Sequence, residues 1–132
     1  MKFSFTGETK AVFGTTLKRI QRDDTGEVGG WVEGAGNLSM DGAAWVSGDA
    51  MVYGDAWVHG DAQVSGAARV YGTARVSGAA WVSGDAQVYG AARVYGDAQV
   101  YGAARVYGDA WVHGDAQVSG TTSIMTGELT TP

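Results

Sequence analysis

The sequence contains no cysteine and a single proline, Pro132. Without cysteine the chain has no disulfide framework and no thiolate metal site. Proline removes a backbone hydrogen-bond donor, so its scarcity suits an uninterrupted β ladder. No apolar run approaches the length of a membrane span, and the start, MKFSFTGETK, lacks the apolar core of a secretory signal. We therefore expect no membrane partner and a cytoplasmic location.

Positive charge is also scarce, because nine Lys and Arg residues stand against 14 Asp and Glu, a net charge of −5. Nucleic-acid polymers bind basic surfaces, so we expect neither DNA nor RNA as a partner. A small anionic ligand held by a few local arginines remains compatible with this balance. No P-loop, nucleophile motif or paired-carboxylate signature occurs, and two histidines are too few for the usual histidine metal sites. We expect no cofactor, no metal and no catalytic residue.

Valine, in contrast, recurs at every sixth position from Val46 to Val118, and Ile124 continues the series. The unit reads Val-x-Gly-(Asp/Ala/Thr)-Ala-x. This period fits neither an α-helix nor a long strand, but it fits a short strand followed by a sharp corner. Along the strand Val and Ala point inward, while the residues on either side of Val point outward. Glycine tolerates the backbone angles of the corner. The pattern predicts a parallel β-helix.

These hexads resemble the hexapeptide repeat of left-handed β-helices, in which three hexads form one triangular coil. The resemblance implies an all-β, left-handed parallel β-helix of about five coils and, as is usual in that family, a parallel homotrimer. Sorting the residue after each valine by eighteen supports three sides, because one column is then entirely tyrosine: Tyr53, Tyr71, Tyr89 and Tyr107. Sorting by twelve mixes Tyr, Ser and His in both columns. A 14-residue segment, YGDAWVHGDAQVSG, occurs twice, at 53–66 and 107–120, and both copies fall on the same face.

The two ends of the chain depart from the strict pattern. We expect residues 1–40 to form a β cap, residues 41–124 the β-helix and residues 125–132 a C-terminal tail, since the edges of a β-helix need covering. Val32 and Leu38 are six residues apart but out of phase with Val46 by two. This offset favours an early pair of hexads followed by an insertion around residues 39–44.

Residues 26–46, GEVGGWVEGAGNLSMDGAAWV, add a second resemblance. Together with the GDA-type hexads they resemble a family of small phage and prophage proteins with a GGWxE…NLS…GxAWV segment. Members of that family are described as hypothetical, polymer-forming or acyltransferase-like. The resemblance implies a phage origin and the cytoplasm of an infected bacterial host.

One outward face, which we call the His face, carries the candidate ligand-binding residues: Trp57, His59, Arg75, Arg93, Tyr95, Trp111 and His113. Arg75 and Arg93 fall on adjacent coils, where like charges repel unless something neutralises them. Guanidinium groups recognise phosphate and aromatic rings stack on bases, so this set suits a nucleotide or a cyclic oligonucleotide. An open alternative is that Asp61, Asp97 or Asp115, or a neighbouring subunit, neutralises the arginines.

The sequence therefore favours a non-enzymatic, phage-derived binding protein that sequesters a small anionic ligand, such as a cyclic nucleotide immune messenger. Such sequestration would evade an anti-phage defence. One alternative is a hexapeptide-repeat acyltransferase with His59 or His113 as general base. Another is a structural or polymer-forming phage protein.

Overall fold

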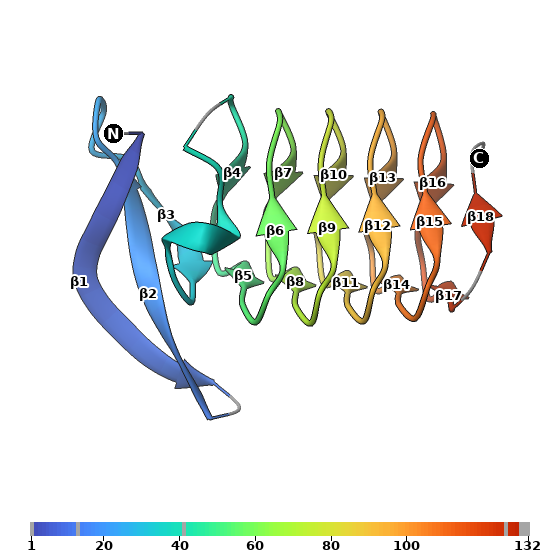
Figure 1. Ribbon diagram of the computed structural model, residues 1–132, viewed down its shortest axis with the longest axis horizontal. Helices are drawn as coiled ribbons and strands as arrows, with labels where there is room; N and C mark the ends of the chain where they lie inside the picture. The colour runs from blue at the N-terminus through green and yellow to red at the C-terminus, as the bar shows by residue number, and fades with distance from the viewer. Residues whose placement is uncertain (1, 13, 41, 126, 130–132) are drawn as a thin grey trace.

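The computed structural model describes residues 2–12, 14–40, 42–125 and 127–129. It shows an N-terminal hairpin followed by a stack of parallel coils (Figure 1). The longer strands are β1 (Phe3–Val12), β2 (Thr15–Arg22) and β3 (Val28–Val32), followed by a single 3-10 turn, η1 (Ala35–Asn37). All later strands have two residues: β4 (Trp45–Val46), β5 (Met51–Val52), β6 (Trp57–Val58), β7 (Gln63–Val64), β8 (Arg69–Val70), β9 (Arg75–Val76), β10 (Trp81–Val82), β11 (Gln87–Val88), β12 (Arg93–Val94), β13 (Gln99–Val100), β14 (Arg105–Val106), β15 (Trp111–Val112), β16 (Gln117–Val118), β17 (Ser123–Ile124) and β18 (Glu128–Leu129).

Every third short strand pairs in parallel, which produces three sheets and a coil of about eighteen residues. One sheet carries β6, β9, β12, β15 and β18 and forms the His face. A second contains β4, β7, β10, β13 and β16, and we call it the Ser face; the third, which holds β5, β8, β11, β14 and β17, is the Tyr face. The predicted parallel β-helix of about five coils is confirmed.

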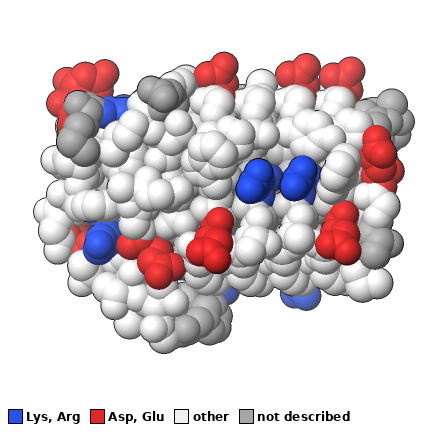
Figure 2. Space-filling model, viewed as in Figure 1, with Lys and Arg blue, Asp and Glu red and all other residues white. Residues whose placement is uncertain are grey.

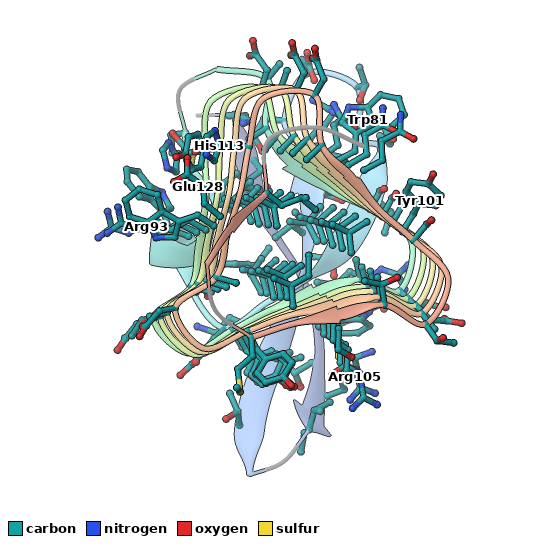
Figure 3. The ribbon with its side chains drawn as sticks, turned by 90° about the vertical axis from the view of Figure 1, so that its right-hand side faces the viewer. Trp81, Arg93, Tyr101, Arg105, His113 and Glu128 are labelled. Carbon is teal, nitrogen blue, oxygen red and sulfur yellow. The ribbon has the colours of Figure 1, made fainter. Side chains whose placement is uncertain are left out.

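The hand of the coil is visible from the C-terminal end (Figure 3). The chain passes from Tyr101 on the right to Arg105 at the bottom and His113 on the left, and it advances toward the viewer. A clockwise path toward the viewer is a left-handed helix, as the hexads indicated.

The interior of the stack is a dry column of small apolar side chains. The valines from Val46 to Val118 and every sixth alanine from Ala44 to Ala116 are almost wholly shielded from solvent and form one cluster. Burial of this apolar surface supplies the main stabilisation of each coil, at about 25 cal/mol per Å². Because each unit contacts only its neighbours, the stability of the stack comes from the contacts between adjacent coils and not from a globular core.

The corners require glycine for two reasons. Gly78 has φ of 65°, a left-handed conformation that costs other residues roughly 1–2 kcal/mol. A Cβ on Gly78 would also lie 2.8 Å from the backbone nitrogen of Gly96 in the next coil. The close stacking of corners therefore excludes side chains at this position.

The first coil begins earlier than the unbroken valine series. Val32 pairs with Val52 and Leu38 forms a bridge to Val58, a separation of 20 residues, whereas Val46 pairs with Val64 at 18. The two extra residues lie between Leu38 and Val46, where the change of phase indicated an insertion. Residues 28–38 of the expected cap segment are thus stacked on the β-helix.

The N-terminal hairpin covers the open end of the stack. β1 pairs antiparallel with β2, and β2 pairs antiparallel with β3, which continues in parallel with β5. Trp45 is only 2% exposed and contacts the Phe3 ring edge-on, with the Arg22 guanidinium 4.1 Å from its ring. This part of the cap therefore explains one of the outward tryptophans as buried packing.

At the other end, β18 extends the stack beyond Ile124. Leu129 pairs with Val112 and Glu128 with Trp111, although the tail lacks the Gly-Ala pattern. No helix in the described part of the chain is long and apolar enough to cross a lipid bilayer.

Candidate ligand site on the His face

The His face aligns its outward side chains in one register. Trp57, Arg75, Arg93 and Trp111 are successive partners along β6, β9, β12 and β15, and Glu128 of β18 follows Trp111. A second column lies two residues further along the chain, toward the corner, and contains His59, Ser77, Tyr95 and His113. The seven residues that the sequence predicted for ligand binding thus share one face.

A pocket of about 270 Å³ lies between these columns and is lined by His59, Arg75, Ser77, Arg93, Tyr95 and Trp111. Five of the seven predicted residues line it. Trp57 and His113 do not, and each supports a lining ring from outside. Trp57 stacks on His59 with the ring centres 3.8 Å apart, and His113 stacks on Tyr95 at 4.8 Å.

The pocket arginines have no carboxylate partner among the residues that the structure describes. The Arg93 guanidinium lies 5.4 Å from the Trp111 ring, a cation–π contact, and its side chain points away from the coil (Figure 3). Asp61, one candidate for neutralising them, accepts a hydrogen bond from the Ala43 backbone instead. Figure 2 shows two basic side chains side by side at the centre of this face. Within the described part of the chain, the alternative of acidic neutralisation is therefore not found.

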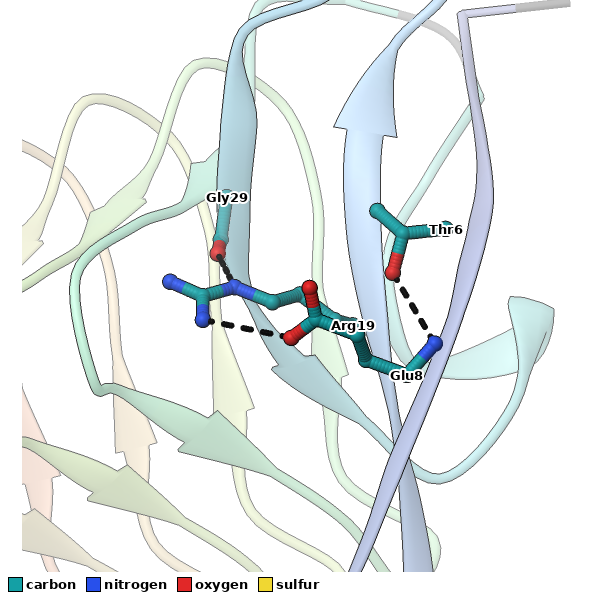
Figure 4. A network of polar contacts seen from close by, with 4 residues as sticks. All are labelled: Thr6, Glu8, Arg19 and Gly29. Atoms are coloured by element: carbon teal, nitrogen blue, oxygen red, sulfur yellow. Dashed lines mark hydrogen bonds and ion pairs between the residues drawn. The ribbon is translucent and has the colours of Figure 1, made fainter.

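The cap arginines provide a contrast within the same chain. Arg19 approaches the Glu8 carboxylate at 3.6 Å and donates to the Gly29 carbonyl at 3.1 Å (Figure 4). The Glu8 backbone N–H donates to the Thr6 hydroxyl. Arg22 pairs with Glu27 at 3.0 Å. These two cap arginines have acidic partners, whereas the two pocket arginines have none among the described residues.

The two histidines occupy identical sequence repeats but different surroundings. Burial, assisted by the nearby Arg75 charge, lowers the pKa of His59 below its ordinary value, so His59 is neutral at neutral pH. His113 places Nε2 2.6 Å from the Glu128 carboxylate, and both side chains are visible in Figure 3. The repeat pattern does not predict a role for Glu128, although the alternation of outward Glu128 with inward Leu129 is a short strand signal.

The other two faces differ from the His face in kind. On the Tyr face, Tyr53, Tyr71, Tyr89 and Tyr107 form a stacked ladder with ring centres 4.9–5.1 Å apart. Burial, followed by the neighbouring phenols, raises the pKa of Tyr71, so the Tyr71 hydroxyl stays neutral. On the Ser face, the outward positions of the strands and the residues after the valines carry no charge, and Trp81 is 54% exposed.

A larger hollow, about 420 Å³, lies beside the 3-10 turn and is lined by Glu33, Asn37, Asp55 and glycines. Asn37 uses its side chain to bond backbone groups of residues 33, 34, 54 and 56. Glu33 accepts a hydrogen bond from the Gly54 backbone. The polar groups of this hollow join the 3-10 turn to the next coil, and its acidic lining disfavours anions.

Comparison with protein families relates the chain to one repeat type. Residues 44–60, 68–84, 86–102 and 98–114 are similar to the family described as YdcK Beta solenoid repeat, and together span a little under half of the chain. No curated protein matches it. The chain is a β-solenoid repeat protein, and the function has to be argued from the His face.

Proposed function

We propose that this chain is a non-enzymatic, phage-derived binding protein that sequesters a small anionic ligand, such as a cyclic nucleotide immune messenger. The observation that supports the proposal is the pairing of Arg75 with Arg93 on adjacent strands without a carboxylate in the described residues. Two cations held side by side favour an anion between them. The aromatic rings of Tyr95 and Trp111 in the same pocket suit a base.

Isothermal titration calorimetry with cyclic di- and trinucleotides tests this proposal. We expect micromolar or tighter binding to the unmodified protein, lost in the double variant Arg75→Ala/Arg93→Ala. Arg105→Ala is the matched control, because Arg105 is an exposed arginine on the Tyr face, outside the pocket. The ligand recovered after heat denaturation should be chemically intact. If no nucleotide binds at micromolar concentration, the proposal is wrong.

We also propose a homotrimer in which the Ser face contributes to the subunit contact. The chain carries a net charge of −5, so copies repel each other except where a face lacks charge. The Ser face meets this condition, and exposed Trp81 offers a large aromatic anchor. Light scattering coupled to size exclusion measures the assembly; a strictly monomeric protein would refute it.

The phage origin and a place in the cytoplasm of an infected bacterium belong to the same proposal and rest on the resemblance of residues 26–46. A sequestering protein acts in the cell and is not part of the particle. Mass spectrometry of purified virions should therefore not detect the chain. Stoichiometric recovery in virions would favour the structural alternative.

Acyl transfer is the second candidate, and the contact between His113 and Glu128 is the observation in its favour. A carboxylate on one imidazole nitrogen fixes the tautomer and leaves the other nitrogen as a base. Turnover of acetyl-CoA that disappears in His113→Ala and persists in His59→Ala would establish this activity. Absence of turnover with a broad panel of amine and hydroxyl acceptors would remove it.

A further inference from the structure

The pocket on the His face has two chemically different halves. His59, Arg75 and Ser77 form a polar half around β9. Neither the Arg75 guanidinium nor the Ser77 hydroxyl has a hydrogen-bond or ionic partner among the described side chains. Neutral His59 adds one N–H donor, so this half offers a cation and two further donors to an anion.

The other half is a wall of aromatic rings around β12 and β15. Tyr95 meets Trp111 edge-on at 6.4 Å and stacks on His113, which is held by Glu128. Arg93 lies against the Trp111 ring, between this wall and Arg75. Trp111 remains 40% exposed, which leaves ring surface for a planar partner. Rings fixed by their neighbours bind such a partner with little loss of entropy.

The duplicated Trp-x-His units are therefore not equivalent ends of a symmetric site. His59 covers the Trp57 ring at 3.8 Å, and Trp57 does not line the pocket. Trp111 does line it, with Tyr95 edge-on and the Arg93 guanidinium 5.4 Å from its ring. A ligand with one aromatic ring is thus directed toward β15.

The dimensions limit what one chain can hold. The volume of about 270 Å³ lies just below the range of roughly 300–1,000 Å³ that is usual for small-molecule sites. Arg75 and Trp111 are two register steps apart, which is about 10 Å at the spacing of neighbouring strands. One phosphate joined to one base spans the two halves, whereas two phosphates and two bases require a second pocket.

We infer that each chain binds one nucleotide unit in a fixed orientation, with its phosphate between Arg75 and Arg93 and its base against Trp111 and Tyr95. This rests on the proposed function. The three pockets of one trimer cannot be shared in pairs, so a cyclic dinucleotide is then shared between the pockets of two chains from different trimers. Adenosine and inorganic phosphate each engage only one half of the pocket.

Native mass spectrometry and calorimetry on the full-length protein test the inference with four probes: 5′-AMP, adenosine, inorganic phosphate and cyclic di-AMP. We expect one AMP per chain, binding of adenosine and of phosphate at least tenfold weaker than AMP, and one cyclic di-AMP per two chains. AMP should compete with cyclic di-AMP. One cyclic di-AMP per chain without competition by AMP would overturn the inference and leave the proposed function standing. Failure of every nucleotide probe to bind would remove both.

The orientation has its own matched pair of variants in the two sequence repeats. Trp111→Ala should weaken AMP at least tenfold, whereas Trp57→Ala should weaken it by less than threefold, because base stacking is lost only in the former. Equal losses, or a larger loss in Trp57→Ala, would reverse the assigned orientation. Circular dichroism checks that both variants fold, and the stoichiometry above is measured on the unmodified chain.

Discussion

Arg75 and Arg93 are direct register partners on the parallel strands β9 and β12, and neither forms an ion pair within the described residues. Neighbouring strands are separated by about 4.8 Å, so the two side chains leave the sheet close together. Like charges in such a position destabilise a sheet. The fold tolerates this cost at the pocket on the His face, as functional sites commonly do.

The first prediction concerns the free protein. Arg75→Gln removes the repulsion and should raise the free energy of unfolding by roughly 0.2–1 kcal/mol at low salt. High salt screens the charges and should abolish the gain. Arg105→Gln is the control, because the register neighbours of Arg105 are uncharged Gln87 and Ser123. Urea unfolding at two ionic strengths measures the effect, and a destabilised Arg75→Gln variant would show that Arg75 has a structural partner.

The second prediction concerns the corners. Gly120→Ala should cost roughly 1–2 kcal/mol, because φ is 64° but no atom lies within 4 Å of the added Cβ. Gly78→Ala should cost a further 1–3 kcal/mol or so, since its Cβ meets the backbone of Gly96 as well. Chemical unfolding of both variants gives the difference. Equal costs would mean that adjacent corners are less tightly stacked than described.

The third prediction separates two tryptophans of the Ser face. Trp45→Ala should destabilise the chain by about 3–5 kcal/mol, because Trp45 is buried beneath the cap. Trp81→Ala should change the stability of the monomer by less than about 0.5 kcal/mol, since Trp81 is exposed. It should nevertheless weaken the proposed trimer. Thermal unfolding and light scattering, both across a dilution series, distinguish the two effects, and an unchanged assembly would exclude Trp81 from the contact.

The fourth prediction concerns pH. The pKa of His59 is lowered in the folded chain, so the unfolded chain binds a proton first as the pH falls below about 6.5. The contribution of His59 to stability is therefore complete above that pH and is lost progressively below it. The difference in melting temperature between the parent protein and His59→Gln should shrink or reverse from pH 7.5 to 5. A difference independent of pH would contradict the assignment.

A separate measurement tests the contribution of Arg75 to the lowered pKa of His59. Arg75 contributes to the lowered pKa of His59 by direct charge repulsion, after burial. An NMR titration of His59 should therefore give a higher pKa in Arg75→Gln than in the parent protein. An unchanged pKa would leave burial as the sole cause.

The coils were predictable from the sequence because the narrow core and the tight corner restrict the residues of every hexad in the same way. Only small inward residues fit the thin core, and only glycine fits the corners, so Val76 and Gly78 reveal their roles by position. The covering of Trp45 was not predictable, since it depends on how the hairpin of β1 and β2 folds back, and that contact has no periodic signal.

The sequence predicted which residues share the His face, but it did not predict which of their side chains contact one another. The repeats around His59 and His113 are identical in sequence, and their difference arises from Arg75 on one side and Glu128 on the other. Position in the stack therefore decides which residue of each copy lines the pocket, His59 in the first and Trp111 in the second. Glu128 was missed because the tail breaks the glycine pattern while keeping its place in the sheet.

The number of stacked coils also sets the distance between the two tryptophans of the His face. The two copies of YGDAWVHGDAQVSG are 54 residues apart, so β9 and β12 are the strands between Trp57 and Trp111 on the His face. Inserting or deleting one eighteen-residue coil would move these tryptophans by one strand spacing, about 4.8 Å, without altering a corner or the cap. Duplication of whole coils thus gives such a protein a way to change the length of its candidate binding surface in discrete steps.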